Sequence, residues 1–97
     1  MEAARSLSRA LGRRYASAIL LQLRGAKQPW GATDLERAVG GPVGSAIATA
    51  RHLASHGLVQ VKEIRGVAGK PAYQIRLTAR GVSLADGLAR LSKVMEG

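Results

Sequence analysis

The stretches HGLVQVKEIR (residues 56–65) and YQIRLTARG (residues 73–81) decide the fold of this chain. In the first, Gly57 follows an apolar-periodic segment, as the left-handed cap of a helix does, and two valines then alternate in a run rich in β-branched residues. In the second, aromatic and aliphatic side chains alternate with polar ones, which is typical of a half-buried strand. Residues 66–71, rich in glycine, are predicted as the loop between them. The two stretches therefore predict a helix end, a β-hairpin and, from Thr78 as N-cap, another helix.

Three helices are predicted ahead of the hairpin from apolar periodicity, over residues 13–24, 32–39 and 43–56. Gly12 separates the first of them from residues 1–11, which form either an N-terminal extension of that helix or a separate short helix. The final helix is predicted over residues 79–95, where apolar side chains recur at spacings of three and four.

The connections are short. Residues 26–31 are interpreted as a linker, with Pro29 holding its neighbour extended and Trp30 filling the core. The next connection is a tight one of two glycines, and Pro42 after it suits the first position of the third helix. The inward stripe predicted for that helix comprises Val43, Ile47, Ala50, Leu53 and Ala54.

Composition narrows the class of partner. The 97 residues fit a single domain over residues 1–97, and the 46% of hydrophobic residues favours a folded chain. Fifteen lysines and arginines against six acids give a net charge of +9. This charge predicts a polyanionic partner, either nucleic acid or an anionic membrane surface, and the alternative is a solvated basic surface without a partner.

Several function classes are disfavoured. The absence of cysteine excludes disulfides, thiolate zinc sites and cysteine nucleophiles, and it fits a reducing cytoplasm. The acids are scattered, and neither a nucleophile elbow nor a phosphate loop is present, so we expect neither an enzyme nor a cofactor. His52 and His56 have a spacing that can bind a metal, but no carboxylate is close in sequence, so no metal site is predicted. No segment approaches the roughly 20 apolar residues of a membrane-spanning helix, and the charged N-terminus does not resemble a signal peptide.

The order helix, helix, helix, hairpin, helix, with Gly-Leu-Val at 57–59 and Leu-Thr-x-x-Gly at 77–81, resembles winged helix-turn-helix transcriptional regulators of the MarR, PadR and HxlR type. Gly-Arg-Arg-Tyr at 12–15, followed by an apolar segment up to Gly25, resembles their first helix. The resemblance covers about residues 12–95. It implies a mostly helical winged-helix fold with a small β-hairpin, and double-stranded DNA rather than a membrane as the partner.

In such a fold the third helix, here residues 43–56, enters the major groove. The candidates to reach base edges are Ser45, Ala48, Thr49, Arg51 and His52. The wing, residues 62–76, would contact the backbone or minor groove through Lys62, Arg65, Lys70 and Arg76. The alternatives are that the helix residues merely face solvent and that the wing cations protect a strand edge. Four arginines near the N-terminus either bind phosphates or serve solubility: Arg5, Arg9, Arg13 and Arg14.

The apolar stripe of the last helix is longer than one small core can cover, which predicts a homodimer. The expected interface residues are Leu7, Leu11, Leu84, Leu88, Leu91 and Met95. The leading hypothesis is a dimeric transcriptional regulator, cytoplasmic and nucleoid-associated, without a small-molecule effector. The alternatives are a non-specific architectural DNA-binding protein, since the third helix offers a single arginine, and a protein-interaction winged helix in a larger assembly.

Overall fold

The computed structural model describes residues 2–66 and 71–96, and the side chains of residues 5–66 and 72–96. The elements, in chain order, are α1 (Glu2–Leu11), α2 (Ala16–Leu23), β1 (Trp30–Gly31), α3 (Ala32–Val39), α4 (Ser45–Ser55), β2 (Val59–Arg65), β3 (Pro71–Leu77) and α5 (Ala79–Glu96). The predicted mostly helical fold with a hairpin between the third and last helices is confirmed. The N-terminal segment is a separate helix, α1, because the chain bends over residues 12–15, where Tyr15 has a left-handed φ of 71°.

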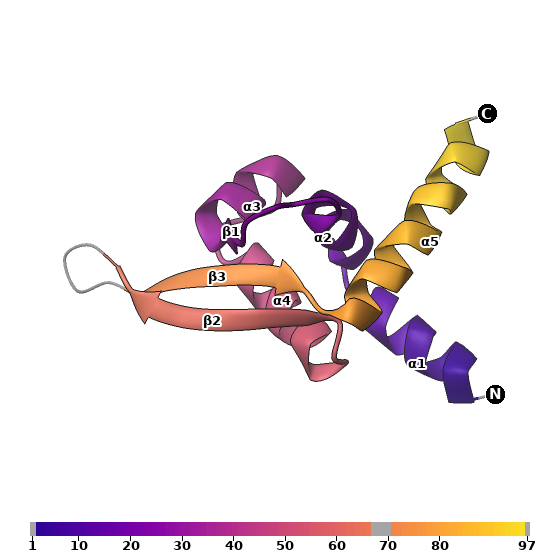
Figure 1. The fold of residues 1–97 in the computed structure, drawn as a ribbon, viewed down its shortest axis with the longest axis horizontal. Helices are drawn as coiled ribbons and strands as arrows, with labels where there is room; N and C mark the ends of the chain where they lie inside the picture. Colours follow the sequence, from indigo (N-terminus) through magenta and orange to yellow (C-terminus); the bar gives the residue numbers. More distant parts are fainter. Residues whose placement is uncertain (1, 67–70, 97) are drawn as a thin grey trace.

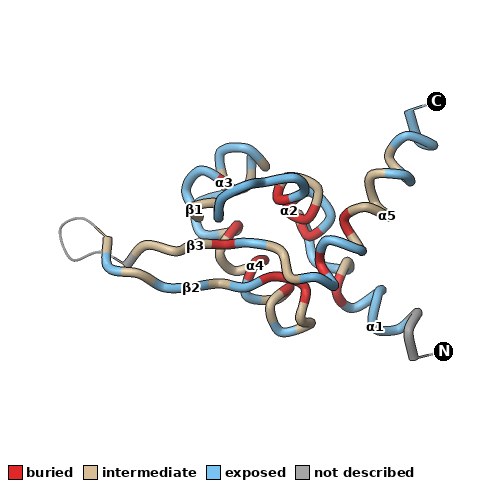
Figure 2. The backbone as a smooth tube through the Cα atoms, viewed as in Figure 1, coloured by how far each residue is buried: buried red, intermediate tan, exposed pale blue. Residues whose placement is uncertain are grey.

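The core is built from small aliphatic side chains, as a sequence without phenylalanine requires. Its largest fully buried members are Ile19, Leu20, Leu35, Leu53 and Ile75, which come from α2, α3, α4 and β3. Figure 2 shows the buried residues gathered where these elements meet, whereas the outer part of α5 is exposed. The hairpin projects from one end of this core, and the free ends of α1 and α5 project from the opposite end (Figure 1).

The sheet has three strands rather than the two that were predicted, in the order β1-β3-β2. β2 and β3 pair antiparallel from Val59 opposite Leu77 outward, and β1 pairs with β3 through Trp30 opposite Ile75. The interpretation of residues 26–31 as linker alone was therefore wrong at its end. Trp30 does pack against the core, as predicted, because its backbone pairs with the buried centre of β3.

α4 begins later than predicted. Gly44 adopts a left-handed φ of 85°, so Pro42 and Val43 lie in a turn before the helix and not in its first turn. The Gly44 amide donates a hydrogen bond of 2.7 Å to Oε2 of Glu36 in α3, which holds this turn. Val43, predicted to face inward, is 97% exposed, because the left-handed turn removes it from the helical register.

Hydrogen bonds at the start of α5 join the two stretches of sequence that decide the fold. The Thr78 hydroxyl accepts a hydrogen bond from the Gly81 amide at 3.1 Å, which confirms the predicted N-cap. The same hydroxyl donates to the Gly57 carbonyl at 2.6 Å, and the Thr78 amide donates to the Leu58 carbonyl at 3.0 Å. A Cβ on Gly81 would overlap that Leu58 carbonyl oxygen. The two stretches are therefore locked together, and the hairpin is fixed at its base.

Candidate nucleic-acid interface

α4 presents a narrower outward face than predicted. Its buried face consists of Ala46, Thr49, Ala50 and Leu53. The prediction that Thr49 faces outward was wrong, because Thr49 is 2% exposed and its hydroxyl donates to the Arg14 carbonyl at 3.4 Å. Thr49 lies one turn before Leu53, so it shares the core face. Arg51 is exposed, and Ser45 and Ala48 are partly exposed.

His52 lies on the flank of α4 that faces α1. Its Nε2 is 3.0 Å from the carbonyl oxygen of Arg9, and its ring packs edge-on against His56 with centroids 4.9 Å apart. The expectation that His52 reads base edges is therefore weakened, since this ring nitrogen already has a partner within the chain. Within residues 5–66 and 72–96, no group of three or more histidines and acids is arranged to hold a metal ion.

Arg51 lies against the wing. Its guanidinium carbon is 5.4 Å from the centre of the Tyr73 ring in β3, within the range of a cation–π contact. Tyr73 pairs with Glu63 of β2, and strand alternation places Arg65 on the same side of the hairpin. We call the patch formed by Ala48, Arg51, Glu63, Arg65 and Tyr73 the helix–wing surface. It joins the outward face of α4 to the hairpin.

The other predicted wing residues lie elsewhere. By the same alternation, Lys62 and Arg76 project from the opposite side of the hairpin, where both are exposed. The Arg76 Nε donates to Oε1 of Gln60 at 3.1 Å, which is a pairing across the two strands. Lys70 lies outside the described residues. The structure thus divides the wing cations between the two faces of the hairpin.

The segment that carries the four N-terminal arginines contacts α4 on its other side through backbone carbonyls. Arg5, Arg9, Arg13 and Arg14 are all exposed. Their segment is tied to α4 by the two contacts already described, from Thr49 and His52 to backbone carbonyls of this segment. α4 therefore lies between the wing and a basic segment. Within the described parts of the chain a single ion pair forms, Arg24 with Asp86 at 2.8 Å, and it joins α2 to α5 rather than to these elements.

Sequence reasoning missed two residues that shape this interface. Glu36 holds the turn before α4, and Tyr73 holds Arg51. In the sequence Glu36 is one of the scattered acids, and Tyr73 is an aromatic residue of a predicted strand. Both act on partners in other elements, and neither partner is indicated by spacing along the chain.

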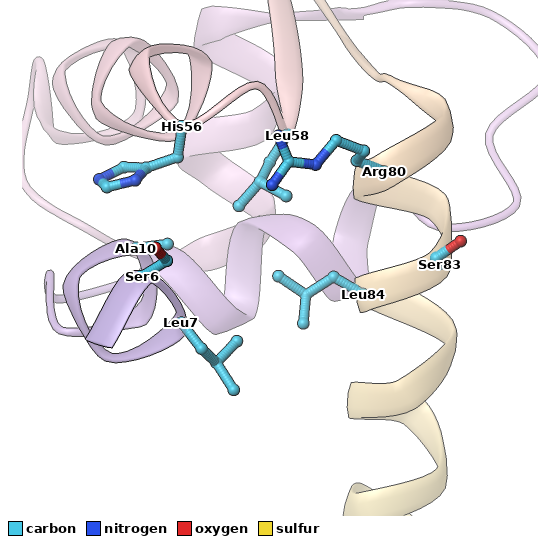
Figure 3. Close-up of a pocket in the computed structure, with 8 residues that line it drawn as sticks. All are labelled: Ser6, Leu7, Ala10, His56, Leu58, Arg80, Ser83 and Leu84. Carbon is cyan, nitrogen blue, oxygen red and sulfur yellow. The ribbon is translucent and has the colours of Figure 1, made fainter. Parts of the chain in front are cut away.

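The predicted dimer residues lie at the opposite end of the molecule, on α1 and α5. Leu11, Leu84 and Leu88 pack partly on the core, whereas Leu7, Leu91 and Met95 are 45%, 62% and 87% exposed. A groove of about 740 Å³ separates the two helices. Figure 3 shows Leu7 and Leu84 on its two walls, and His56 and Arg80 at one end.

Comparison with known proteins yields matches in structure alone, since no family model and no curated protein sequence matches the chain. A crystal structure described as a transcriptional regulator of the MarR family, from Porphyromonas gingivalis W83, is similar with a TM-score of 0.76 at 20% identity, over 93% of this chain and 85% of that one. The fold is a winged helix-turn-helix. A PadR-like transcription factor from Bacteroides fragilis is also similar, with a TM-score of 0.67 at 21% identity, over 82% of this chain and 81% of that one. The predicted resemblance to the MarR and PadR types is thereby confirmed at the level of the fold.

In this winged helix, α3 and α4 form the helix-turn-helix, and β2 and β3 form the wing. None of the helices within residues 2–66 and 71–96 has the length and apolar character needed to cross a bilayer.

Proposed function

We propose that this protein binds double-stranded DNA as a transcriptional regulator, with α4 in the major groove and the wing on the backbone or minor groove. The observation that carries the proposal is the position of α4, which carries the exposed Arg51 and lies between the wing and the basic N-terminal segment. Winged-helix and related domains dock their recognition helix in this way. Both similar structures are described as transcription regulators, which supports the same ligand.

The structure changes the residues assigned to each role. Arg51, Ala48 and Ser45 are proposed to reach base edges. Thr49 is removed from the predicted set because it is buried, and His52 because its Nε2 contacts the Arg9 carbonyl. On the wing, Arg65 is proposed to contact DNA from the side of the hairpin that carries Tyr73, the partner of Arg51. Lys62 and Arg76 are proposed to contact a neighbouring phosphate strand from the other face. The N-terminal arginines are proposed to bind phosphates: Arg5, Arg9, Arg13 and Arg14. We expect contacts with the DNA phosphate backbone to supply most of the affinity. Because the proposed ligand is DNA, the proposed place of action is the nucleoid in the cytoplasm.

A second copy of the chain is proposed to cover the apolar side chains of α1 and α5. Exposed Leu91, Val94 and Met95 extend beyond the core on the outer half of α5, and large exposed apolar groups of this kind mark interaction sites. A two-fold dimer through this end leaves both wings free at the other, and binding to two half-sites requires its two copies of α4 to lie about one DNA turn apart.

Replacing Arg51 with alanine is expected to lower the affinity for duplex DNA by about tenfold. The variant removes the charged side chain of α4 that is itself proposed to reach a base edge. Arg90→Ala is the matched control, since it removes the same charge from exposed α5 and should change the affinity by less than about twofold. Titration of a fluorescent duplex measures both. An equal loss in the two variants would show that total charge, rather than this contact, sets the affinity.

A non-specific architectural role is the second candidate, favoured by the small outward face of α4 with its single arginine. Selection of bound sequences from a random duplex pool at physiological salt separates the two. A regulator is expected to enrich a palindromic motif, since a two-fold dimer meets two equivalent half-sites. Recovery of the unselected pool without enrichment would contradict the regulator and favour the architectural protein.

A further inference from the structure

Val43 is an apolar side chain that the fold leaves almost completely in water. It is 97% exposed, the highest value among the large hydrophobic residues with described side chains. The other exposed ones all lie on α1 or α5, away from α4: Leu7, Val82, Leu91, Val94 and Met95. Val43 lies just before α4, on the part of the molecule that is proposed to bind DNA. The proposed dimer interface on α1 and α5 therefore does not cover it.

The turn that carries Val43 is held from several sides. The Glu36 carboxylate accepts from the Gly44 amide at 2.7 Å, and the Ser45 amide donates to the Pro42 carbonyl at 3.0 Å. Ahead of it, a Cβ on Gly41 would come within 3.2 Å of the Tyr15 ring, so the backbone passes close to that ring. The valine is therefore presented on a restrained backbone, and little conformational freedom remains to be lost when a ligand contacts it.

The side chains of this turn, residues 42–44, are apolar, and none of them is a cation. Proline has no amide hydrogen, and the Gly44 amide is occupied by Glu36. The carboxylate of Glu36 at this helix end disfavours a phosphate there, because the two anions repel each other. Residues at the start of a recognition helix are the ones that approach base edges in the major groove, and the apolar group on those edges is the 5-methyl group of thymine.

We propose that Val43 is a specificity-determining residue that packs on the 5-methyl group of a thymine in the major groove. The inference rests on the proposed DNA binding and adds a base preference to it. It assigns a role in sequence discrimination to a turn residue outside α4 itself.

The test compares an alternating adenine–thymine duplex with the same duplex made with uracil, which lacks only the methyl group. The unaltered protein is expected to bind the thymine duplex about fourfold more tightly for each methyl contacted, as the burial of one such carbon predicts. Val43→Ala should lose most of this ratio while its thermal unfolding stays unchanged. Val82→Ala, a matched change of an exposed valine on α5, should keep the ratio.

The outcomes separate the two claims. Equal binding of the thymine and uracil duplexes by the unaltered protein, or a full ratio in Val43→Ala, would overturn the role of Val43 and leave DNA binding intact. Absence of binding to either duplex at low salt would overturn the proposed function, and the inference with it.

Discussion

Gly81→Ala is expected to destabilise the fold by at least about 3 kcal/mol, a large fraction of the stability of a small domain. Gly81 lies in the first turns of α5, where an added Cβ would overlap the Leu58 carbonyl oxygen. That oxygen also accepts the Thr78 amide, so it cannot move without breaking the link between the hairpin base and α5. Urea unfolding followed by circular dichroism measures the loss as a lowered midpoint.

The control is Gly87→Ala in the same helix. Apart from its chain neighbours and the backbone of α5, none of the described atoms lies within 4 Å of the position its Cβ would take, so the substitution meets open space. Alanine is the better helix former, and the free energy of unfolding should rise by up to about 1 kcal/mol. If Gly81→Ala proved as stable as Gly87→Ala, α5 would not pack as closely on the hairpin base as the structure shows.

Leu91→Glu combined with Met95→Glu is expected to separate the proposed dimer and to lower the affinity for duplex DNA by at least about a hundredfold, because simultaneous contact by two linked recognition helices is lost. Both side chains lie on the outer half of α5, 62% and 87% exposed, so the folded monomer should tolerate the change. Sedimentation equilibrium gives the mass, and titration of a duplex gives the affinity.

Lys93→Glu is the matched control, since it changes the net charge by the same amount as the double substitution. Position 93 lies about 200° around the helix from position 91, on its other side. This variant should remain dimeric and lose only the part of the affinity that net charge contributes. A dimeric double variant, or an unaltered protein that is monomeric at high concentration, would contradict the proposed interface.

The sequence predicted the helices and the hairpin well, because their signals are local. Gly57 and Thr78 indicated where elements end and begin, and the structure shows the Thr78 hydroxyl hydrogen-bonded to Gly57 and to Gly81. β1 escaped prediction because a strand of two residues has no periodicity, and its pairing with Ile75 is a long-range contact.

The outward face of α4 was predicted less well. Alanines occur around the whole helix, so its phase rested on a few residues such as Val43 and Thr49. Both residues gave the wrong phase for the helix. Val43 precedes the helix, and Thr49 is buried, with its hydroxyl hydrogen-bonded to the Arg14 carbonyl. The contact of Arg51 with Tyr73 joins α4 to β3, and only the packed structure brings them together.

The central claim is that the basic surface around α4 binds the phosphate backbone of duplex DNA. Its most direct test is the dependence of the association constant for a random duplex on salt concentration, with both on logarithmic axes. Each phosphate contact contributes a slope of about −0.9, so a dimer making six contacts predicts a slope near −5. A slope close to zero, or no binding at low salt, would contradict the claim.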